Sequence, residues 1–399
     1  MRIFTGTPCN FNGTADFFDR DSGLTVCGFN AIGVESRSIT LGPAKENDLP
    51  LMTRASWNEL EDSDWWRALN LDVFVFYTWG NPKYRGMLKA VMDAGIPVAQ
   101  VADQQGFISP LADWPAHLKA EGAHYWHQPR WKQIARTMVK LPYTAGARIL
   151  LRDLPYAKMI AASDLFLTAT PSAAQRYKRF LSRTGYAKRT QQVQFCPIPV
   201  NFHFRYDPNI KKANEVIAVG RWDSIQKRTP LLTRTIERTL RLRPTSRFRI
   251  FGRITEELET WHNSLPEPHQ AQVTLEGMVS NLELVKSYQS TRCMLVSAAY
   301  EGCHNASAEA LCCGTTVVAC RSPFLGALEW HAGSDSGTLA ESSSAESLSD
   351  ALINELAAWD HGMRDPAIIS REWTQIMHPD RVATRIITLF KEVQSRKLR

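Results

Sequence analysis

The sequence predicts an α/β protein of two domains, each built on a parallel sheet with helices on both of its faces. Two observations support this prediction. Short apolar runs of strand length alternate with helical patterns along most of the chain, which is typical of sheets wound on both sides. The chain has 399 residues, a length that suits two domains of ordinary size.

The first half of the chain starts this alternation. A polar loop rich in glycine, asparagine and aspartate follows the opening strand, and residues 42–70 show no regular pattern. The expected strands are residues 2–7, 38–41, 72–78, 96–101, a stretch inside 159–170 and residues 193–195, and the expected helices are residues 24–32, 82–94 and 171–181.

The second half repeats the alternation. Gly314 lies directly after an expected helix, at the place where a glycine commonly ends one. The expected strands are residues 216–219, 248–251, 273–276, 293–296 and 317–319, and the expected helices are one that ends near residue 241 and residues 256–263, 306–313 and 379–391.

The composition is that of a globular protein. Hydrophobic residues make up 44% of the chain and charged residues 22%. No apolar run approaches the roughly 18 residues that a membrane-spanning helix needs, and the N-terminus lacks the apolar segment of a secretory signal. The eight cysteines show no metal-binding spacing. These features predict reduced thiols and a cytoplasmic protein, and they leave open a peripheral attachment at the inner face of a membrane.

Residues 301–319 contain the pattern around which the chain is organised. A buried strand is expected before Glu301, and Asn305 is the expected N-cap of the helix that follows. The backbone N–H groups of residues 302–306 can then point at an anion, with support from the helix dipole. The carboxylates of Glu301 and Glu309 can accept hydrogen bonds from hydroxyl groups. A ligand rich in phosphate and hydroxyl groups, such as a sugar nucleotide, fits this pattern.

The same stretch resembles the signature of retaining glycosyltransferases with the GT-B fold, of the Glu-x7-Glu (glycosyltransferase family 4-like) type. The family usually reads Glu-Gly-Phe-Gly-x4-Glu-Ala-x3-Gly-x-Pro-Val-Val-Ala; here Cys303 replaces the aromatic residue, His304 the second glycine and Thr316 the proline. The resemblance implies two Rossmann-like domains facing across a cleft. It also implies metal-independent, retaining transfer of a hexosyl-type sugar from a nucleoside-diphosphate sugar to a hydroxyl acceptor, with no cofactor besides these substrates.

The resemblance further assigns domains and roles. Residues 1–200 would form the acceptor domain, for a sugar, glycolipid or other hydroxyl compound, and residues 201–370 the nucleotide-sugar domain. Residues 371–399 would form a C-terminal helix that crosses back to the first domain. Glu309 would bond the ribose and Glu301 the sugar, and the other donor-binding residues expected in this loop are Gly302, Cys303, His304 and Asn305.

A second group of candidates follows the strand at residues 216–219. Gly220, Arg221 and Lys227 resemble the family's Gly-Arg and Lys-Gly pair, with one residue more than the usual spacing and Arg228 in place of the second glycine. A nucleoside diphosphate gains negative charge as its bond to the sugar breaks, and arginine and lysine can hold that charge. We therefore expect Arg221 and Lys227 to act in catalysis beside Glu301, with Arg228 able to exchange roles with Lys227.

The first half of the chain contributes two candidates. Asp103 follows the strand at residues 96–101, at the face of the sheet where sites form, and it is a catalytic candidate for contact with acceptor or sugar. The family often has a histidine before this aspartate, but here the preceding residue is Ala102. Gly23 is a candidate for close approach of the backbone to the donor phosphate. A turn cap and an ordinary turn glycine are the simpler interpretations of Asp103 and Gly23.

Positive charge is concentrated in residues 130–189. This segment contains 13 Lys and Arg against only Asp153 and Asp164, a net charge of +11, whereas the whole chain carries +7. The rest of the chain is therefore acidic, and the basic segment indicates a partner for its surface.

The start of the basic segment predicts an amphipathic helix, because Lys132, Arg136 and Lys140 share one face and apolar residues share another. Three interpretations stay open: a surface helix packed on its own domain, a surface that docks on anionic lipid headgroups, and a platform for an anionic acceptor, including nucleic acid. The nearby His124 and His127 are either structural or assist at an acceptor hydroxyl.

Other functions remain compatible with the sequence. The triplets at residues 19–21 and 62–64 have the Asp-x-Asp form of metal-dependent transferases, but neither follows an apolar run, so both are expected to be loop carboxylates. A sugar-nucleotide epimerase of the same architecture would act on the donor alone. A non-catalytic protein would use the basic segment to bind a membrane surface or nucleic acid.

Overall fold

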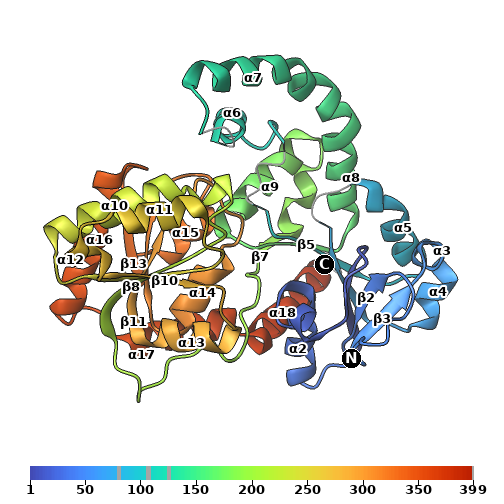
Figure 1. Ribbon diagram of the computed structural model, residues 1–399. Coiled ribbons are helices and arrows are strands. Elements are labelled where there is room, and N and C mark those ends of the chain that lie inside the picture. The colour runs from blue at the N-terminus through green and yellow to red at the C-terminus, as the bar shows by residue number, and fades with distance from the viewer. Residues whose placement is uncertain (79–81, 105–108, 124–126, 398–399) are drawn as a thin grey trace. The chain divides into compact units, whose positions relative to one another are not determined.

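The computed structural model describes residues 1–78, 82–104, 109–123 and 127–397 (Figure 1). The chain divides into two compact units, one of residues 1–121, 131–201 and 376–399, and one of residues 122–130 and 202–375. Each unit contains one sheet in which all paired strands are parallel. Helices flank both sheets, so the predicted fold class of two Rossmann-like, doubly wound domains is confirmed.

The first sheet has seven strands among the described residues, in the order β3-β2-β1-β4-β5-β6-β7. Its central strands β1, β4 and β5 are buried along their whole length, as expected of parallel strands covered on both faces. The strands are β1 (Ile3–Thr7), β2 (Ser38–Leu41), β3 (Met52–Ala55), β4 (Val73–Tyr77), β5 (Val98–Ala102), β6 (Leu165–Thr168) and β7 (Val193–Phe195). The helices of this unit are α1 (Ala15–Phe18), α2 (Asp21–Ala31), α3 (Trp57–Leu60), α4 (Ser63–Ala68), α5 (Arg85–Asp93), α6 (Trp114–Ala123), α7 (Arg130–Pro142), α8 (Leu154–Ala162), α9 (Pro171–Arg183) and α18 (Pro379–Lys397).

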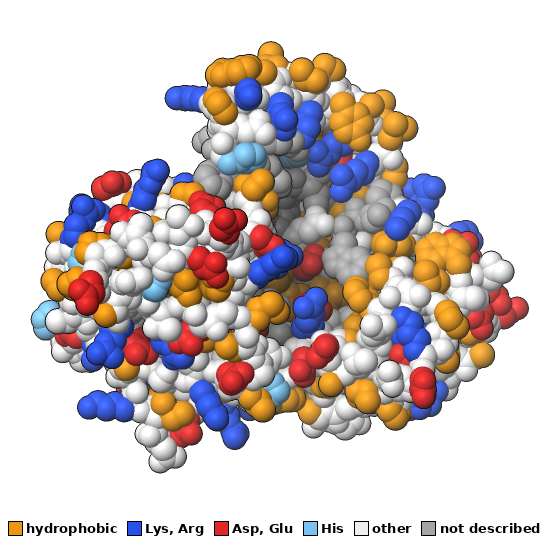
Figure 2. Space-filling view, in the orientation of Figure 1, with side chains coloured by type: hydrophobic (Ala, Val, Ile, Leu, Met, Phe, Trp, Pro, Cys, Tyr) orange, Lys and Arg blue, Asp and Glu red, His pale blue; other side chains and the backbone are white. Residues whose placement is uncertain are grey.

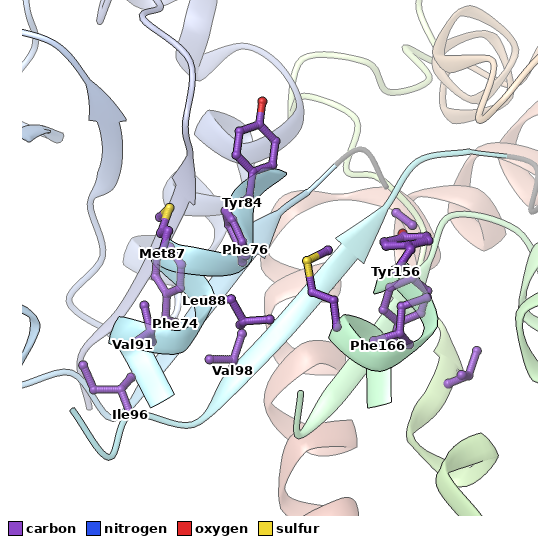
Figure 3. Close-up of a cluster of buried hydrophobic side chains, with 14 of the residues drawn as sticks. Phe74, Phe76, Tyr84, Met87, Leu88, Val91, Ile96, Val98, Tyr156 and Phe166 are labelled. Atoms are coloured by element: carbon purple, nitrogen blue, oxygen red, sulfur yellow. The ribbon is translucent and has the colours of Figure 1, made fainter. Parts of the chain in front are cut away.

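The core of the first unit forms where α5 and α8 cover one face of this sheet (Figure 3). Phe74 and Phe76 lie two positions apart on β4, so both side chains point to the same face, and their ring centroids are 5.6 Å apart. Trp66 packs against Phe74 at 4.7 Å and donates its indole N–H to the carbonyl of Leu60 at 2.9 Å. The expectation that residues 42–70 are irregular is therefore wrong: β3, α3 and α4 are too short to show a period, but they bury this tryptophan.

The last helix, α18, packs against α2 of the first unit. The two helices approach closely at Gly28, where an added Cβ would lie 2.1 Å from the carbonyl oxygen of Pro379. Arg385 of α18 also donates to the carbonyl of Phe195 at 3.0 Å. Any side chain at position 28 would push α18 away from α2.

The second sheet has six described strands in the order β10-β9-β8-β11-β12-β13. The helix before β12 ends as predicted, because Gly314 follows it with a φ of +73°, a conformation that glycine adopts without strain. The strands are β8 (Ala213–Val219), β9 (Arg247–Phe251), β10 (Val273–Gly277), β11 (Thr291–Val296), β12 (Thr316–Cys320) and β13 (Gly337–Ala340). The helices are α10 (Thr229–Leu242), α11 (Glu256–Ser264), α12 (Glu267–Gln270), α13 (Asn281–Ser290), α14 (Asn305–Cys312), α15 (Gly326–His331), α16 (Ala345–Asp360) and α17 (Pro366–Met377).

All eight cysteines are free thiols. Among the described residues, none of the helices combines the length and the apolar composition that a bilayer crossing requires.

Candidate active site

The candidate site lies where the second sheet changes its direction of growth. From β8 the chain builds outward through β9 to β10, and it then returns to the other side of β8 with β11, β12 and β13. β8 and β11 are neighbours, with Ile217 paired to Met294. In open parallel sheets, ligands bind beyond the carboxyl ends of the strands at such a switch point. The loops that leave these two strands, residues 220–228 and 297–304, are therefore the expected walls of a ligand site.

Hydrogen bonds join the two loops to each other. The side-chain amide of Gln226 donates to the carbonyl of Tyr300 at 2.8 Å, and the N–H of Ala299 donates to the carbonyl of Gln226 at 2.8 Å. The hydroxyl of Ser297 donates to the carbonyl of Lys227 at 2.6 Å. These hydrogen bonds hold the two loops, which are distant in the sequence, in a fixed arrangement.

Lys227 and Glu301 form an ion pair across these loops. Lys227 Nζ lies 2.6 Å from Glu301 Oε1, and the two side chains are only 15% and 10% exposed. The backbone of Glu301 is fixed in turn, because its N–H donates to the carbonyl of Phe324 at 2.9 Å. The structure therefore brings together two of the predicted catalytic residues, and each neutralises a charge that would otherwise be poorly solvated.

The other predicted residues of the first loop are placed differently. Arg221 is exposed at the start of the loop. Gly220 packs against Gly252, where an added Cβ would lie 1.9 Å from the Gly220 carbonyl oxygen. Arg228 has a left-handed φ of +52° and donates to the carbonyl of Ser343 at 3.3 Å. Lys227, not Arg228, therefore occupies the position beside Glu301.

His304 begins α14 in a way that the sequence did not predict. The expected N-cap was Asn305, but the helix starts at that residue and His304 is the cap. Ser307 donates its backbone N–H to His304 Nδ1 at 3.3 Å. His304 has a left-handed φ of +40°, which strains a side chain with a Cβ. The family's glycine at this position adopts such a conformation without strain.

The protonation state of His304 follows from its surroundings. Burial, the charge of Lys227 and the neighbouring His331 hold the pKa of the imidazole well below its usual range, so the ring is neutral near pH 7. Because Nδ1 accepts from Ser307, the proton lies on Nε2. Nε2 is 4.0 Å from Glu301 Oε1 and is buried with no hydrogen-bond partner among the described residues. His304 thus presents an unsatisfied N–H donor close to Glu301.

His331 completes this arrangement, and sequence analysis missed it. The hydroxyl of Ser307 lies 2.8 Å from His304 Nδ1 and 2.6 Å from His331 Nδ1. Burial lowers the pKa of His331 to about 3, so this ring is also neutral. The ring packs edge-on against Trp373, with centroids 5.1 Å apart. No sequence motif links these positions, because the contact depends on how α14 and α15 pack.

Substitutions of His304 should separate its strain from its role as a cap. We expect His304→Ala to lower the free energy of unfolding by about 1 kcal/mol, because the cap is lost while the strain stays. His304→Gly loses the cap but relieves a left-handed conformation whose cost is also about 1 kcal/mol, so its stability should stay near that of the wild type. His304→Asn serves as the control, because asparagine can both cap the helix and adopt the left-handed conformation. Urea unfolding would test this order, and an alanine variant as stable as the glycine variant would contradict it.

The start of α14 offers backbone N–H donors. Gly302 and Cys303 are half-buried in the loop before it. The N–H groups of Gly302, His304, Asn305 and Ala306 donate to no backbone carbonyl in the described part of the chain. They can bind an anion with support from the helix dipole.

Glu309 lies in the middle of α14, and its side chain is half-buried. Desolvation raises the pKa of this carboxyl to about 7. Burial, and next the charge of Glu309, raise the pKa of the Tyr288 phenol. Within the described residues no ion pair compensates the charge of Glu309, which is unusual for a desolvated carboxylate.

Asp103 lies in a different place, on the wall of a cavity in the first unit. Burial, and next the charge of Asp21, raise the pKa of Asp103 to about 6. Its Oδ1 atom is buried without a hydrogen-bond partner among the described residues. The cavity has a volume of about 330 Å³ and is lined by Phe11, Asn12, Thr14, Asp16, Phe17, Arg20, Asp21, Ser22, Tyr77, Asp103 and Ile198.

Sequence analysis missed most of this cavity, because its wall comes from separate segments. Besides Asp103, the sequence contained one signal, the triplet at residues 19–21, which we interpreted as loop carboxylates. Asp21 begins α2 with a left-handed φ of +48° and lines the cavity. Tyr77 is buried beside it, with its hydroxyl 2.7 Å from that of Thr25. The carboxylates and hydroxyls suit a ligand that carries hydroxyl groups.

Gly23 lies inside α2, which begins three residues before its expected start. An added Cβ would lie 2.2 Å from the carbonyl oxygen of Phe17, so the missing side chain lets the preceding turn pack on the helix. Its contact with a donor phosphate stays a prediction. His127 is exposed, next to Gln128, and His124 lies outside the described residues.

Known proteins resemble both the sequence and the fold. A family model described as "Glycosyl transferases group 1" matches residues 213–357. No protein in a curated set matches the sequence. Sucrose-phosphate synthase from Thermosynechococcus elongatus has a similar structure, with 14% identity, a TM-score of 0.59 and coverage of 99% of this chain and 100% of the other.

Two further structures agree. The Anabaena protein HepE in complex with UDP has 11% identity, a TM-score of 0.63 and coverage of 98% and 100%. The trehalose 6-phosphate synthase from Burkholderia multivorans has 12% identity, a TM-score of 0.63 and coverage of 99% of both chains. Residues 213–357, which contain the joined loops and both glutamates, therefore match a group 1 glycosyltransferase domain, and this match supports a glycosyltransferase built of two Rossmann-like domains.

Proposed function

We propose that this glycosyltransferase moves a hexosyl-type sugar from a nucleoside-diphosphate sugar to a hydroxyl acceptor, with retention of anomeric configuration and without a metal ion. The observation that carries the proposal is the Lys227–Glu301 pair at the switch point of the second sheet. A cation suits the diphosphate and a carboxylate suits sugar hydroxyls. The solved complexes of HepE with UDP, with UDP and glucose, and with UDP-glucose support a donor of this class.

The leaving group would be held by cations and backbone donors. Lys227 has three N–H bonds and gives one to Glu301, so the others can reach phosphate oxygens. Arg221 can add a bidentate contact from the exposed side of the loop. The donors at the start of α14 complete the set. Because negative charge grows on the diphosphate as the sugar leaves, these contacts strengthen in the transition state.

The sugar and ribose would be held by the two glutamates and His304. Glu301 accepts from a sugar hydroxyl, and the neutral Nε2–H of His304 donates to a neighbouring oxygen. Glu309 accepts from the ribose. The acceptor hydroxyl gives its proton to the departing phosphate, on the face that the phosphate leaves, which gives retention.

The experiment that tests the proposal has two stages. A thermal-shift screen of nucleoside diphosphates identifies the base, because ligands of the folded state raise its melting temperature. The matching donor is then incubated with simple glycosides and EDTA, and the anomeric coupling constant of the product is read by NMR. We expect retained configuration and unchanged turnover. An inverted product, or activity that needs an added metal ion, contradicts the proposal; an altered donor sugar without acceptor indicates an epimerase.

We further propose that Asp103 binds an acceptor hydroxyl in the cavity of the first unit. Asp103→Asn should raise KM for the acceptor by about tenfold, because a charge-assisted hydrogen bond of about 1.5–3 kcal/mol is lost, while the Kd for the nucleoside diphosphate stays unchanged. Asp93→Asn, an exposed carboxylate of the same unit, is the control. An unchanged acceptor KM, or a donor Kd that rises with it, would rule out this role.

A further inference from the structure

Helix α7 lies apart from the first sheet, at the top of the view in Figure 1. None of its thirteen residues is buried. Helical turns continue after Pro142, through two π-helical segments at Tyr143–Ala147 and Ile149–Asp153, into α8. A surface helix packed on its own domain would bury its apolar face, whereas Trp131, Ile134 and Met138 of α7 are more than half exposed.

Large apolar side chains are concentrated on this stretch. On α7, Trp131, Ile134 and Met138 follow the spacing of one helix face. Figure 2 shows hydrophobic side chains gathered over this part of the molecule. Eight large hydrophobic residues here are between 37% and 81% exposed: Trp131, Ile134, Met138, Val139, Tyr143, Leu150, Leu151 and Leu154. A soluble domain rarely leaves so many large apolar side chains exposed along one stretch of chain without a partner.

Exposed cations border the apolar face. Arg130, Lys132, Arg136 and Lys140 are all exposed, and residues 130–152 contain no Asp or Glu. Lys132 Nζ lies 5.4 Å from the centre of the Trp131 ring, so charge and aromatic surface meet at the same point. Tryptophan and lysine side by side suit the boundary between lipid headgroups and acyl chains.

We propose that α7 and the turns up to Leu154 dock on an anionic lipid surface, with the apolar face at the level of the upper acyl chains and the cations among the headgroups. Lipid phosphates suit the cations, and the upper acyl chains of the same surface suit the apolar side chains. A nucleic acid would use the cations but leave most of the aliphatic side chains exposed to water. The proposal rests on this surface alone and does not depend on the donor or the acceptor of the transfer reaction.

Vesicle sedimentation of the full chain tests the proposal. We expect binding to vesicles of phosphatidylglycerol and phosphatidylcholine, weaker binding at raised salt, and little binding to phosphatidylcholine alone. Replacing the four cations by glutamine (R130Q, K132Q, R136Q, K140Q) should weaken binding by about 1,000-fold. Replacing four apolar residues by serine (I134S, M138S, L150S, L151S) should weaken it by about tenfold or more.

Matched controls come from the second unit. Its exposed cations Lys211, Arg241, Arg247 and Lys286 are changed to glutamine, and its exposed apolar residues Leu242, Met278 and Leu282 to serine. All variants are first checked for an unchanged melting temperature, and since the α7 side chains are exposed, their removal should not unfold the protein. Full vesicle binding by the serine variant, or equal binding of a single-stranded oligonucleotide and the vesicles by the wild type, overturns the lipid proposal.

Discussion

Replacement of Lys227 by alanine is expected to lower kcat/KM by about 10²- to 10³-fold, the range seen when one donor to a developing charge is removed. The loss should appear in kcat as well as KM, because charge on the diphosphate grows during the reaction. The substitution also removes the cation that pairs with Glu301, whose side chain is only 10% exposed. The free energy of unfolding should therefore fall by about 3 kcal/mol. Initial rates and urea unfolding measure the two effects.

A double substitution separates these effects. Lys227→Met with Glu301→Gln removes both charges, so most of the lost stability should return while activity stays low. Lys286→Ala, an exposed lysine of α13 in the same unit, is the control. If the single Lys227→Ala variant is folded and turns over near the wild-type rate, the ion pair serves the fold alone and the proposed site is wrong.

The pairing of Lys227 with Glu301 could be anticipated because each residue follows an apolar strand. Parallel strands align their carboxyl ends at one edge of a sheet, so residues that follow neighbouring strands come close together. The sequence does not show which strands are neighbours. The resemblance assigned Lys227 and Glu301 to one donor site, and the pairing of β8 with β11 agrees with this assignment. The regular alternation of strand and helix patterns was enough to predict the fold class. The strand β3 and the helices α3 and α4 of residues 42–70 are too short to show a hydrophobic period.

The parts of the site that were missed depend on tertiary contacts or on unusual backbone conformations. His304 is not a common N-cap residue, and its left-handed φ is set by the loop before α14. Ser307 and His331 meet only because α14 packs beside α15. The residues that line the cavity around Asp103 come from segments that follow several different strands. Local patterns contain none of this information.

Glu309 should make the protein less stable at high pH. Its folded pKa of about 7 lies above the value of 4.5 for an exposed glutamate, so the folded state binds this proton more tightly than the unfolded state. The sign follows: stability is full below pH 4.5, is lost as the pH rises to about 7, and stays reduced above it. Glu309→Gln removes the charge and should raise the free energy of unfolding at pH 8 by about 1–3 kcal/mol, with little change near pH 4.5.

The same substitution should weaken binding of the nucleoside diphosphate by about tenfold. An ionised carboxylate accepts hydrogen bonds from ribose hydroxyls more strongly than a neutral amide does. Wild-type affinity should rise between pH 6 and 8 relative to that of the variant, whose amide does not titrate; the ratio of the two Kd values cancels the ionisation of the diphosphate itself. Calorimetric titration and urea unfolding at both ends of this range measure both effects, with the exposed Glu341→Gln as control.

A variant that gains stability but binds the ligand as well as the wild type would leave Glu309 without a ribose contact. One that loses affinity without gaining stability would mean that a compensating group offsets the buried charge. A gain of stability together with a loss of affinity would show that this desolvated carboxylate destabilises the fold and contributes to donor binding.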